Sequence, residues 1–265
     1  MSELLLLEKR APLATITFNR PDKANALEVA WLARMTAFFA EVARDPALRC
    51  VVLRGNGKHF MAGGDLEMLG EMARQPAQQR ATSASESIRQ CNTLIRAMRE
   101  FPKPIIASVQ GGVAGSAVGL VAACDVIVAA DNSFFVLAHV SLGTSNDGLA
   151  SYFLARQIGT RKTLEMALLG DRMNAAEAKA HGLVNFVVPA AELDAETQKL
   201  AARLAAGPTL AYGLIKALVD AAPHNTLAAQ GQLEMELYNK AARSSDLVEG
   251  INAVLAKRPA RFTGT

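Results

Sequence analysis

The chain opens with short apolar segments that alternate with a longer segment of helical periodicity. Residues 4–9 and 14–19 are predicted to be two strands in a hairpin-like arrangement around Ala11-Pro12. Between Ala26 and Arg44 the apolar residues return every three or four positions, which predicts an amphipathic helix ending at Asp45-Pro46. Further buried strands are expected at 50–53, 104–109 and 125–129.

Helical segments separate the predicted strands in the first half of the chain. Glycine-punctuated residues 55–65 and small residues 111–119 each lead into a helix, and 87–99 is helical by its spacing. Repeated strand, loop and helix units favour an α/β fold with helices packed on parallel strands. Residues 73–85 are polar and Gln-rich, and we expect a loop there, either a mobile cover near a site or a surface connection.

The chain beyond Gly159 is predicted to be mainly helical. The expected helices lie at 162–169, 175–181, 192–206, 210–221 and 227–243. Stripes of Leu, Ala and Met in this part are typical of packing surfaces. We therefore expect residues 1–200 to form a core that holds the site, and 201–265 to cover it and join subunits.

The composition is that of a globular protein. Of the 265 residues 51% are hydrophobic and 20% charged, and the formal net charge is +3. This small excess suits a phosphate-bearing small molecule but is too weak to indicate nucleic acid. The run Leu4 to Leu7 precedes its charged residues, unlike a signal peptide, and no stretch has the length of a membrane span. We expect a cytoplasmic enzyme.

The cysteines and most histidines predict neither a disulfide framework nor a metal site. Cys50, Cys91 and Cys124 are odd in number and contain no C-x-x-C pair, so we interpret them as reduced packing residues. Metal-ligand spacing is absent from His59, His181 and His224, so surface or packing roles suffice for them.

Two loops place small residues where a helix begins, at 60–66 and 111–117. Missing side chains let a ligand approach backbone N–H groups, and helix N-termini point such groups at negative charge. Glycine turns are also commonly structural, so each loop alone is weak evidence for a site.

Taken together, the motifs along nearly the whole chain resemble those of the enoyl-CoA hydratase/isomerase (crotonase) family. The matching segments are Asn19 to Leu27, Ala62 to Leu66, Lys103 to Ala107 leading into Gly111, Cys124-Asp125, 176–178 with 182–184, and 257–262. The resemblance implies a spiral of ββα units, normally assembled as a trimer or a pair of trimers, that binds acyl-coenzyme A. No further cofactor, metal, nucleic acid or membrane partner is expected.

The resemblance also implies the binding residues. The positions expected to contact the acyl-CoA substrate are Lys23, Ala24, Ala26, Ala62, Gly63, Asp65, Leu66, Gly115 and Phe262. Lys257, Arg258 and Arg261 are expected either to meet the phosphates and adenine of coenzyme A, from a neighbouring subunit, or to form a solvated basic tail.

By position, the backbone N–H groups of Gly64 and Ser116 would form an oxyanion hole. Ser116 stands where a glycine is commoner in the family, but its N–H remains available. Charge that develops on a thioester oxygen would be held by these two donors, each worth roughly 3–4 kcal/mol in other enzymes.

The side chains depart from the hydratase pattern. The family's hydratases use two glutamates, and the aligned positions here are Gly119 and His139. Asp147 stands where double-bond-shifting members carry an acidic residue and where 4-chlorobenzoyl-CoA dehalogenases carry a nucleophilic aspartate. Those dehalogenases also need a histidine at the position of Asn92 and a tryptophan at that of His139.

Asp147 and His139 each have a second interpretation. Asp147 precedes Gly-Leu-Ala, so it could simply cap a helix. His139 could act as an acid or base, or could be a packed residue. We expect an enoyl-CoA isomerase with Asp147 as base. The alternatives are a hydratase, decarboxylase, hydrolase or dehalogenase-like enzyme, or an inactive acyl-CoA- or RNA-binding protein.

Overall fold

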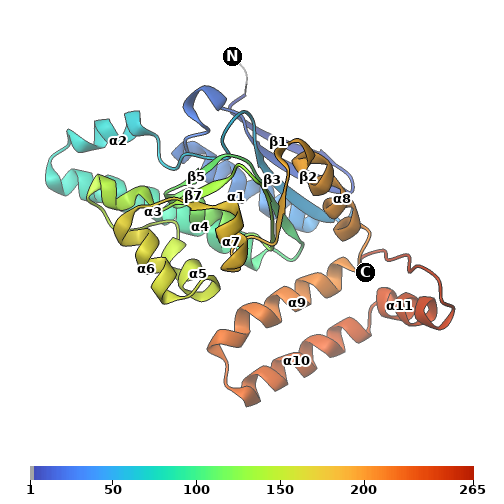
Figure 1. Ribbon diagram of the computed structural model, residues 1–265. Helices are drawn as coiled ribbons and strands as arrows, with labels where there is room; N and C mark the ends of the chain where they lie inside the picture. The colour runs from blue at the N-terminus through green and yellow to red at the C-terminus, as the bar shows by residue number, and fades with distance from the viewer. Residues whose placement is uncertain (1–2) are drawn as a thin grey trace.

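A central six-stranded sheet organises the computed structural model, which describes residues 3–265 (Figure 1). Its strands lie in the order β1-β2-β3-β4-β6-β9. Strand β1 pairs antiparallel with β2, and every other neighbouring pair is parallel. The bounds are β1 Leu5–Arg10, β2 Leu13–Phe18, β3 Cys50–Gly55, β4 Ile105–Val109, β6 Val126–Ala130 and β9 Phe186–Val188.

A second, three-stranded sheet lies in the order β5-β7-β8. Its strands are β5 Gly112–Ala114, β7 Phe134–Val136 and β8 Met173–Asn174. Strand β5 runs parallel to β7, with Val113 opposite Phe135. Strand β5 ends at Ala114, so this small sheet positions Gly115, the residue that precedes α4.

Helices cover the sheets and form the C-terminal part of the chain. They are α1 Val29–Arg44, α2 Leu66–Ala73, α3 Ala77–Glu100, α4 Ser116–Ala122, α5 Ala150–Gln157, α6 Thr160–Leu169, α7 Ala175–Ala180, α8 Leu193–Ala205, α9 Thr209–Ala221, α10 Leu227–Ala242 and α11 Ser245–Leu255. Short 3-10 turns are η1 Pro21–Lys23, η2 Ala138–Leu142, η3 Ala190–Glu192 and η4 Ala222–His224.

Both faces of the six-stranded sheet are buried, as strands of near-continuous apolar residues require. In β3, Val51 and Leu53 face the main core with helices α1, α3 and α4. Cys50 and Val52 face the opposite side, where they pack with residues of α8. The prediction of an α/β fold with helices on parallel strands is therefore confirmed, and the predicted strands lie within a few residues of the observed ones.

The predicted loop at 73–85 is wrong over most of its length, because α3 already begins at Ala77. Only the second half of α3 carries a buried apolar stripe, formed by Cys91, Leu94, Ile95 and Met98. The first half is polar because it extends past the core, so apolar periodicity cannot reveal it. Its Ala, Gln, Arg and Glu residues are nevertheless good helix formers.

The C-terminal helices α9, α10 and α11 lie together at one end of the molecule (Figure 1). Helix α9 is joined to the core by Lys216, whose Nζ lies 2.7 Å from Asp125 Oδ2 and donates to the Lys103 carbonyl. Burial raises the pKa of Asp125 and lowers that of Lys216. Helix α10 buries none of its residues.

Candidate active site

The two small-residue loops lie side by side. The Met61 N–H donates to the Gly112 carbonyl at 3.2 Å, and the Ala114 N–H donates to the Met61 carbonyl at 3.0 Å. Gly63 has a φ of 87°, and a Cβ there would lie 2.7 Å from the Ala114 oxygen. Only glycine fits this crossing point, which brings the backbone of Gly63 next to that of Ala114 and Gly115.

At this crossing two backbone donors are left free. Within residues 3–265, neither the Gly64 N–H nor the Ser116 N–H donates a hydrogen bond to the protein. Ser116 is the first residue of α4, where a helix has no internal acceptor for its N–H. Among the described residues, both predicted oxyanion donors thus lack a protein acceptor, and their role stays a prediction.

The predicted nucleotide-binding segment at 23–27 packs against the same loop. The Ala62 N–H donates to the Ala24 carbonyl at 3.0 Å, and the Leu27 N–H donates to the Gly63 carbonyl at 2.7 Å. Lys23 and Ala26 lie in this segment, so the structure brings together the predicted residues of both segments. Lys23 itself forms an ion pair with Glu67 of α2.

Asn25 holds this segment in place, a role that the sequence pattern did not reveal. Ala24 and Asn25 have φ values of 49° and 55°, and left-handed backbone is better tolerated by asparagine than by most residues. The buried Asn25 side chain donates to the carbonyls of Asn56 and His59 at 2.9 and 2.8 Å. Asparagine in a polar turn was the available signal.

Asp65 stabilises the loop through its side chain. It caps α2 by accepting the Glu67 N–H at 2.8 Å, and it forms an ion pair with Arg20. Burial alone would raise the pKa of Asp65, but the hydrogen bonds from Arg20 and from the Glu67 N–H bring it below its usual value. Leu66, the next residue, is 73% exposed at the start of α2.

The main feature of the candidate site is a contact between His139 and Asp147. The sequence analysis proposed each residue as a candidate but did not predict their contact. Nε2 of His139 lies 2.9 Å from Oδ1 of Asp147. His139 is buried in η2, whereas the Asp147 side chain is 33% exposed. The ring also lies against Gly115, since a Cβ on that glycine would be 3.9 Å from its Nε2.

The alternative prediction that Asp147 caps a helix is wrong. The N-cap of α5 is Leu149, which has a φ of 54°, and no side chain caps the helix. The Asp147 backbone carbonyl accepts the Ala150 N–H at 3.2 Å, but its carboxylate faces His139 instead. The Asp147 carboxylate therefore does not serve as a helix cap.

A family model for enoyl-CoA hydratase/isomerase matches residues 8–265. The chain belongs to this family. It is 35% identical over 264 residues to the 1,2-epoxyphenylacetyl-CoA isomerase of Escherichia coli (strain K12), with 100% of both chains covered. It is also 35% identical over 252 residues to a protein of Rhodobacter capsulatus named probable enoyl-CoA hydratase, with 95% of both covered.

The fold is that of the same enoyl-CoA hydratase/isomerase family. The crystal structure of an enoyl-CoA hydratase from Polaromonas sp. JS666 matches with a TM-score of 0.91 at 32% identity, covering 97% of this chain and 99% of that one. The predicted crotonase-like α/β fold with a helical C-terminal region is confirmed. In the part of the chain that the structure describes, no helix is long and apolar enough to cross a membrane.

Gly119, at the position of one hydratase glutamate, has no room for a side chain. A Cβ there would lie 2.8 Å from the Gly148 carbonyl carbon and closer still to its oxygen. In turn, a Cβ on Gly148 would lie 3.0 Å from the Cα of Ser116. These two glycines let the backbone beside Asp147 lie directly on the first turn of α4.

Buried polar atoms without a protein partner gather on the segment that carries Asp147. Among the described residues there are three such side-chain atoms, Asn92 Oδ1, His139 Nδ1 and Asn146 Nδ2. Two of them belong to the segment 139–148. Cys91 lies close enough to Asp147 that burial, together with this carboxylate, raises the pKa of its thiol to about 12. The thiol is a packing group, as predicted.

Phe262 lies apart from the other predicted binding residues of the same chain. Its carbonyl accepts from Nη1 of Arg49 at 2.9 Å. Arg49 precedes β3, whereas the Gly64 loop follows the other end of that strand. A contact between Phe262 and acyl-CoA therefore requires the Phe262 of a neighbouring subunit, and this role stays a prediction.

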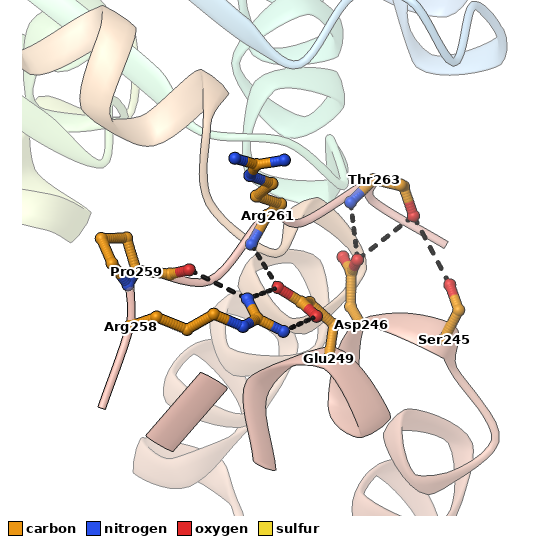
Figure 2. A pocket seen from close by; sticks show the side chains of 7 residues that line it. All are labelled: Ser245, Asp246, Glu249, Arg258, Pro259, Arg261 and Thr263. Atoms are coloured by element: carbon orange, nitrogen blue, oxygen red, sulfur yellow. Dashed lines mark hydrogen bonds and ion pairs between the residues drawn. The ribbon is translucent and has the colours of Figure 1, made fainter. Parts of the chain in front are cut away.

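The basic tail around Phe262 is tied to α11 (Figure 2). The Arg258 guanidinium donates to both oxygens of Glu249 at 2.7 and 2.8 Å, and lowers the pKa of Glu249 to about 2. Arg261 donates its backbone N–H to Glu249, while its side chain points away from this pair. Of the predicted phosphate-binding arginines, Arg258 is thus already paired.

Proposed function

We propose that this chain is an enoyl-CoA isomerase that moves a double bond of an acyl-CoA thioester from C3 to C2. The observation that carries the proposal is that the segment holding the Asp147 carboxylate packs on the start of α4, where Ser116 has an unpaired N–H among the described residues. Asp147 contacts the ring that lies on Gly115, and the next residue, Gly148, packs on Ser116. These contacts support a base at Asp147 close to the proposed oxyanion donor at Ser116.

The proposed reaction is a proton transfer through an enolate. The Asp147 carboxylate takes a proton from C2 of the 3-enoyl thioester, and the electron pair moves to the thioester oxygen. The N–H groups of Gly64 and Ser116 stabilise this oxygen, because preorganised donors act where charge develops. Asp147 then returns the proton to C4, which leaves the conjugated 2-enoyl thioester.

One carboxylate performs both transfers, so the reaction needs no metal or redox cofactor. Coenzyme A enters only as part of the substrate. Lys23, Ala24, Ala26, Ala62, Gly63, Asp65, Leu66 and Gly115 are proposed to form its binding surface, with Phe262 supplied by a neighbouring subunit.

Isomerisation is favoured over hydration by the packing at Gly119. Hydration in this family uses a pair of glutamates, and here the Gly148 backbone occupies the space of one of them. One similar protein is named as an isomerase of an epoxide and another as a probable hydratase, so these names leave the reaction of this chain open. The single carboxylate at Asp147 supports the isomerase.

Conversion of a 3-enoyl-CoA into its 2-enoyl isomer tests the proposal. The conjugated thioester absorbs in the ultraviolet, so its formation can be followed directly. Asp147→Asn keeps the size of the side chain, and we expect it to lose isomerisation and C2 deuterium exchange while melting normally. An active Asp147→Asn variant would exclude Asp147 as the base.

Binding must be measured alongside turnover. Calorimetry with acetoacetyl-CoA should detect a complex with both the wild type and Asp147→Asn. Binding without turnover of any enoyl-CoA would indicate a non-catalytic acyl-CoA-binding protein instead.

A further inference from the structure

We infer that His139 is a positioning residue for Asp147: it holds one carboxylate oxygen and leaves the other to transfer the substrate proton. The inference rests on the isomerase function proposed above and assigns a role to the second titratable group of that site. Two observations carry it, the contact with Asp147 and the contact with Gly115 of the oxyanion loop, together with an argument for the direction of the hydrogen bond.

The contact with Asp147 is short and fixed on one side. The His139 side chain is 8% exposed, and its Nε2 lies 2.9 Å from Oδ1 of Asp147. The imidazole is a rigid ring anchored in η2, whose C-cap is Gly143 with a φ of 68°. The Asp147 side chain is 33% exposed, so the buried ring restrains the more exposed carboxylate.

The direction of the hydrogen bond is set by the competing contacts of Nε2. The backbone N–H of Asp147 also approaches Nε2, at 3.4 Å, but one nitrogen cannot both donate to the carboxylate and accept this N–H. The shorter contact with a charged acceptor selects the form with a proton on Nε2. Both the neutral ring in that form and the imidazolium donate from Nε2.

His139 is therefore not arranged to remove the substrate proton. A general base needs a free lone pair, and the Nε2 lone pair carries the proton donated to Asp147. Nδ1 is buried and contacts no hydrogen-bonding group of the described chain. The ring acts on the reaction through Asp147.

The same ring also contacts the oxyanion loop. A Cβ on Gly115 would lie 3.9 Å from Cε1 and from Nε2 of His139, and Gly115 immediately precedes Ser116. The rigid imidazole of His139 thus contacts both the Asp147 carboxylate and Gly115, the residue before Ser116. This fixes their relative positions, and a displacement of about 1 Å in such a geometry costs roughly 100-fold in rate.

Holding Oδ1 suits a transfer between two carbons. The free oxygen must reach C2 and then C4 of one bound substrate, and a carboxylate rotating freely would spend little time in either geometry. With Oδ1 held by His139, Oδ2 remains as the proton-transfer atom.

Two substitutions separate positioning from proton transfer. His139→Gln places an amide N–H donor at a similar reach, whereas His139→Leu removes the donor. We expect His139→Leu to lower kcat for 3-enoyl-CoA isomerisation by about 100-fold while KM changes less than about 3-fold. We expect His139→Gln to recover kcat to within about 10-fold of the wild type.

Deuterium exchange at C2 of a saturated acyl-CoA should follow the same order, because it reports proton removal without product release. Should His139→Leu fail to fold, His139→Phe keeps a planar ring against Gly115 without a donor and gives the same comparison.

The outcomes distinguish this inference from the isomerase proposal. No isomerisation by the wild type, or full activity of Asp147→Asn, would reject the proposed function itself. If Asp147→Asn is inactive but His139→Leu keeps a normal kcat, only the positioning role fails. If His139→Gln is as inactive as His139→Leu although both fold, the ring takes part in proton transfer and the inference is overturned.

Discussion

Gly119 is a position of the candidate site at which no side chain fits. Because the backbone of Gly148 fills the space beside it, a glutamate at 119 can enter only by displacing the segment that carries Asp147. The packing of the segment that carries Asp147 therefore excludes a glutamate at residue 119.

We predict that Gly119→Glu does not create a hydratase. The wild type should hydrate crotonyl-CoA slowly or not at all, and Gly119→Glu should gain no hydration and lose isomerisation, because overpacking of this kind shifts the backbone. Loss of absorbance of the conjugated thioester measures hydration. Efficient hydration by the wild type would show that His139 or another residue replaces the glutamate pair.

The backbone donor at Gly64 gives a second prediction at the scale of one residue. Gly64→Pro removes the N–H, which donates to no group of residues 3–265, although its ring also fixes φ; it should lower kcat by about 100- to 1000-fold. Circular dichroism should show an unchanged fold. Near-normal turnover of a folded Gly64→Pro would eliminate this donor.

At the scale of elements, Lys103 shows that a family motif can serve the fold alone. Its Nζ donates to the carbonyls of Val42, Asp45 and Leu48, each at 2.7 Å. These groups lie at and just beyond the end of α1, where a cation also interacts favourably with the helix dipole. Lys103 thus joins α1 to the start of β4.

We predict that Lys103→Met destabilises the protein by about 3 kcal/mol, because three carbonyls lose a charged donor. Urea unfolding measures the change. Lys179→Met, on the exposed surface of α7, is the matched control and should change stability by less than about 0.5 kcal/mol. Equal effects of both substitutions would contradict the capping role.

At the scale of the whole molecule, large apolar side chains remain exposed on several helices, and α6, α10 and α11 carry at least three each. On α6 they are Leu164, Leu168 and Leu169, on α10 Leu227, Met235 and Tyr238, and on α11 Val248, Ile251, Val254 and Leu255. Side chains of this kind on neighbouring turns mark association surfaces. They favour the predicted trimer, which would also allow Phe262 to reach a neighbour's site.

We predict that light scattering gives a mass about three or six times 28.1 kDa. Val254→Asp should weaken the assembly, since Val254 is 77% exposed on α11 in the single chain. Asn252→Asp adds the same charge on the same helix without removing an apolar group, and serves as the control. A stable monomer at micromolar concentration would contradict the prediction.

The sequence by itself determined the features that depend on neighbouring residues. Strands such as β3 and helices such as α1 follow from apolar spacing, and the loop around Gly63 follows from the need for glycine. Motif order identified the family and predicted Gly64 and Ser116 as oxyanion donors. Apolar spacing did not predict the polar first half of α3, because such spacing depends on burial and this part of the helix is mostly exposed.

Only the tertiary structure decided how the side chains of the site are used. His139 and Asp147 are eight residues apart, and their contact depends on the path of the turn between them. Gly119 and Gly148 meet because the turn that contains Gly148 packs on α4. The same turn places Leu149, and not Asp147, at the N-cap of α5. Such contacts depend on the backbone path in three dimensions, which no local pattern of hydrophobic and polar residues specifies.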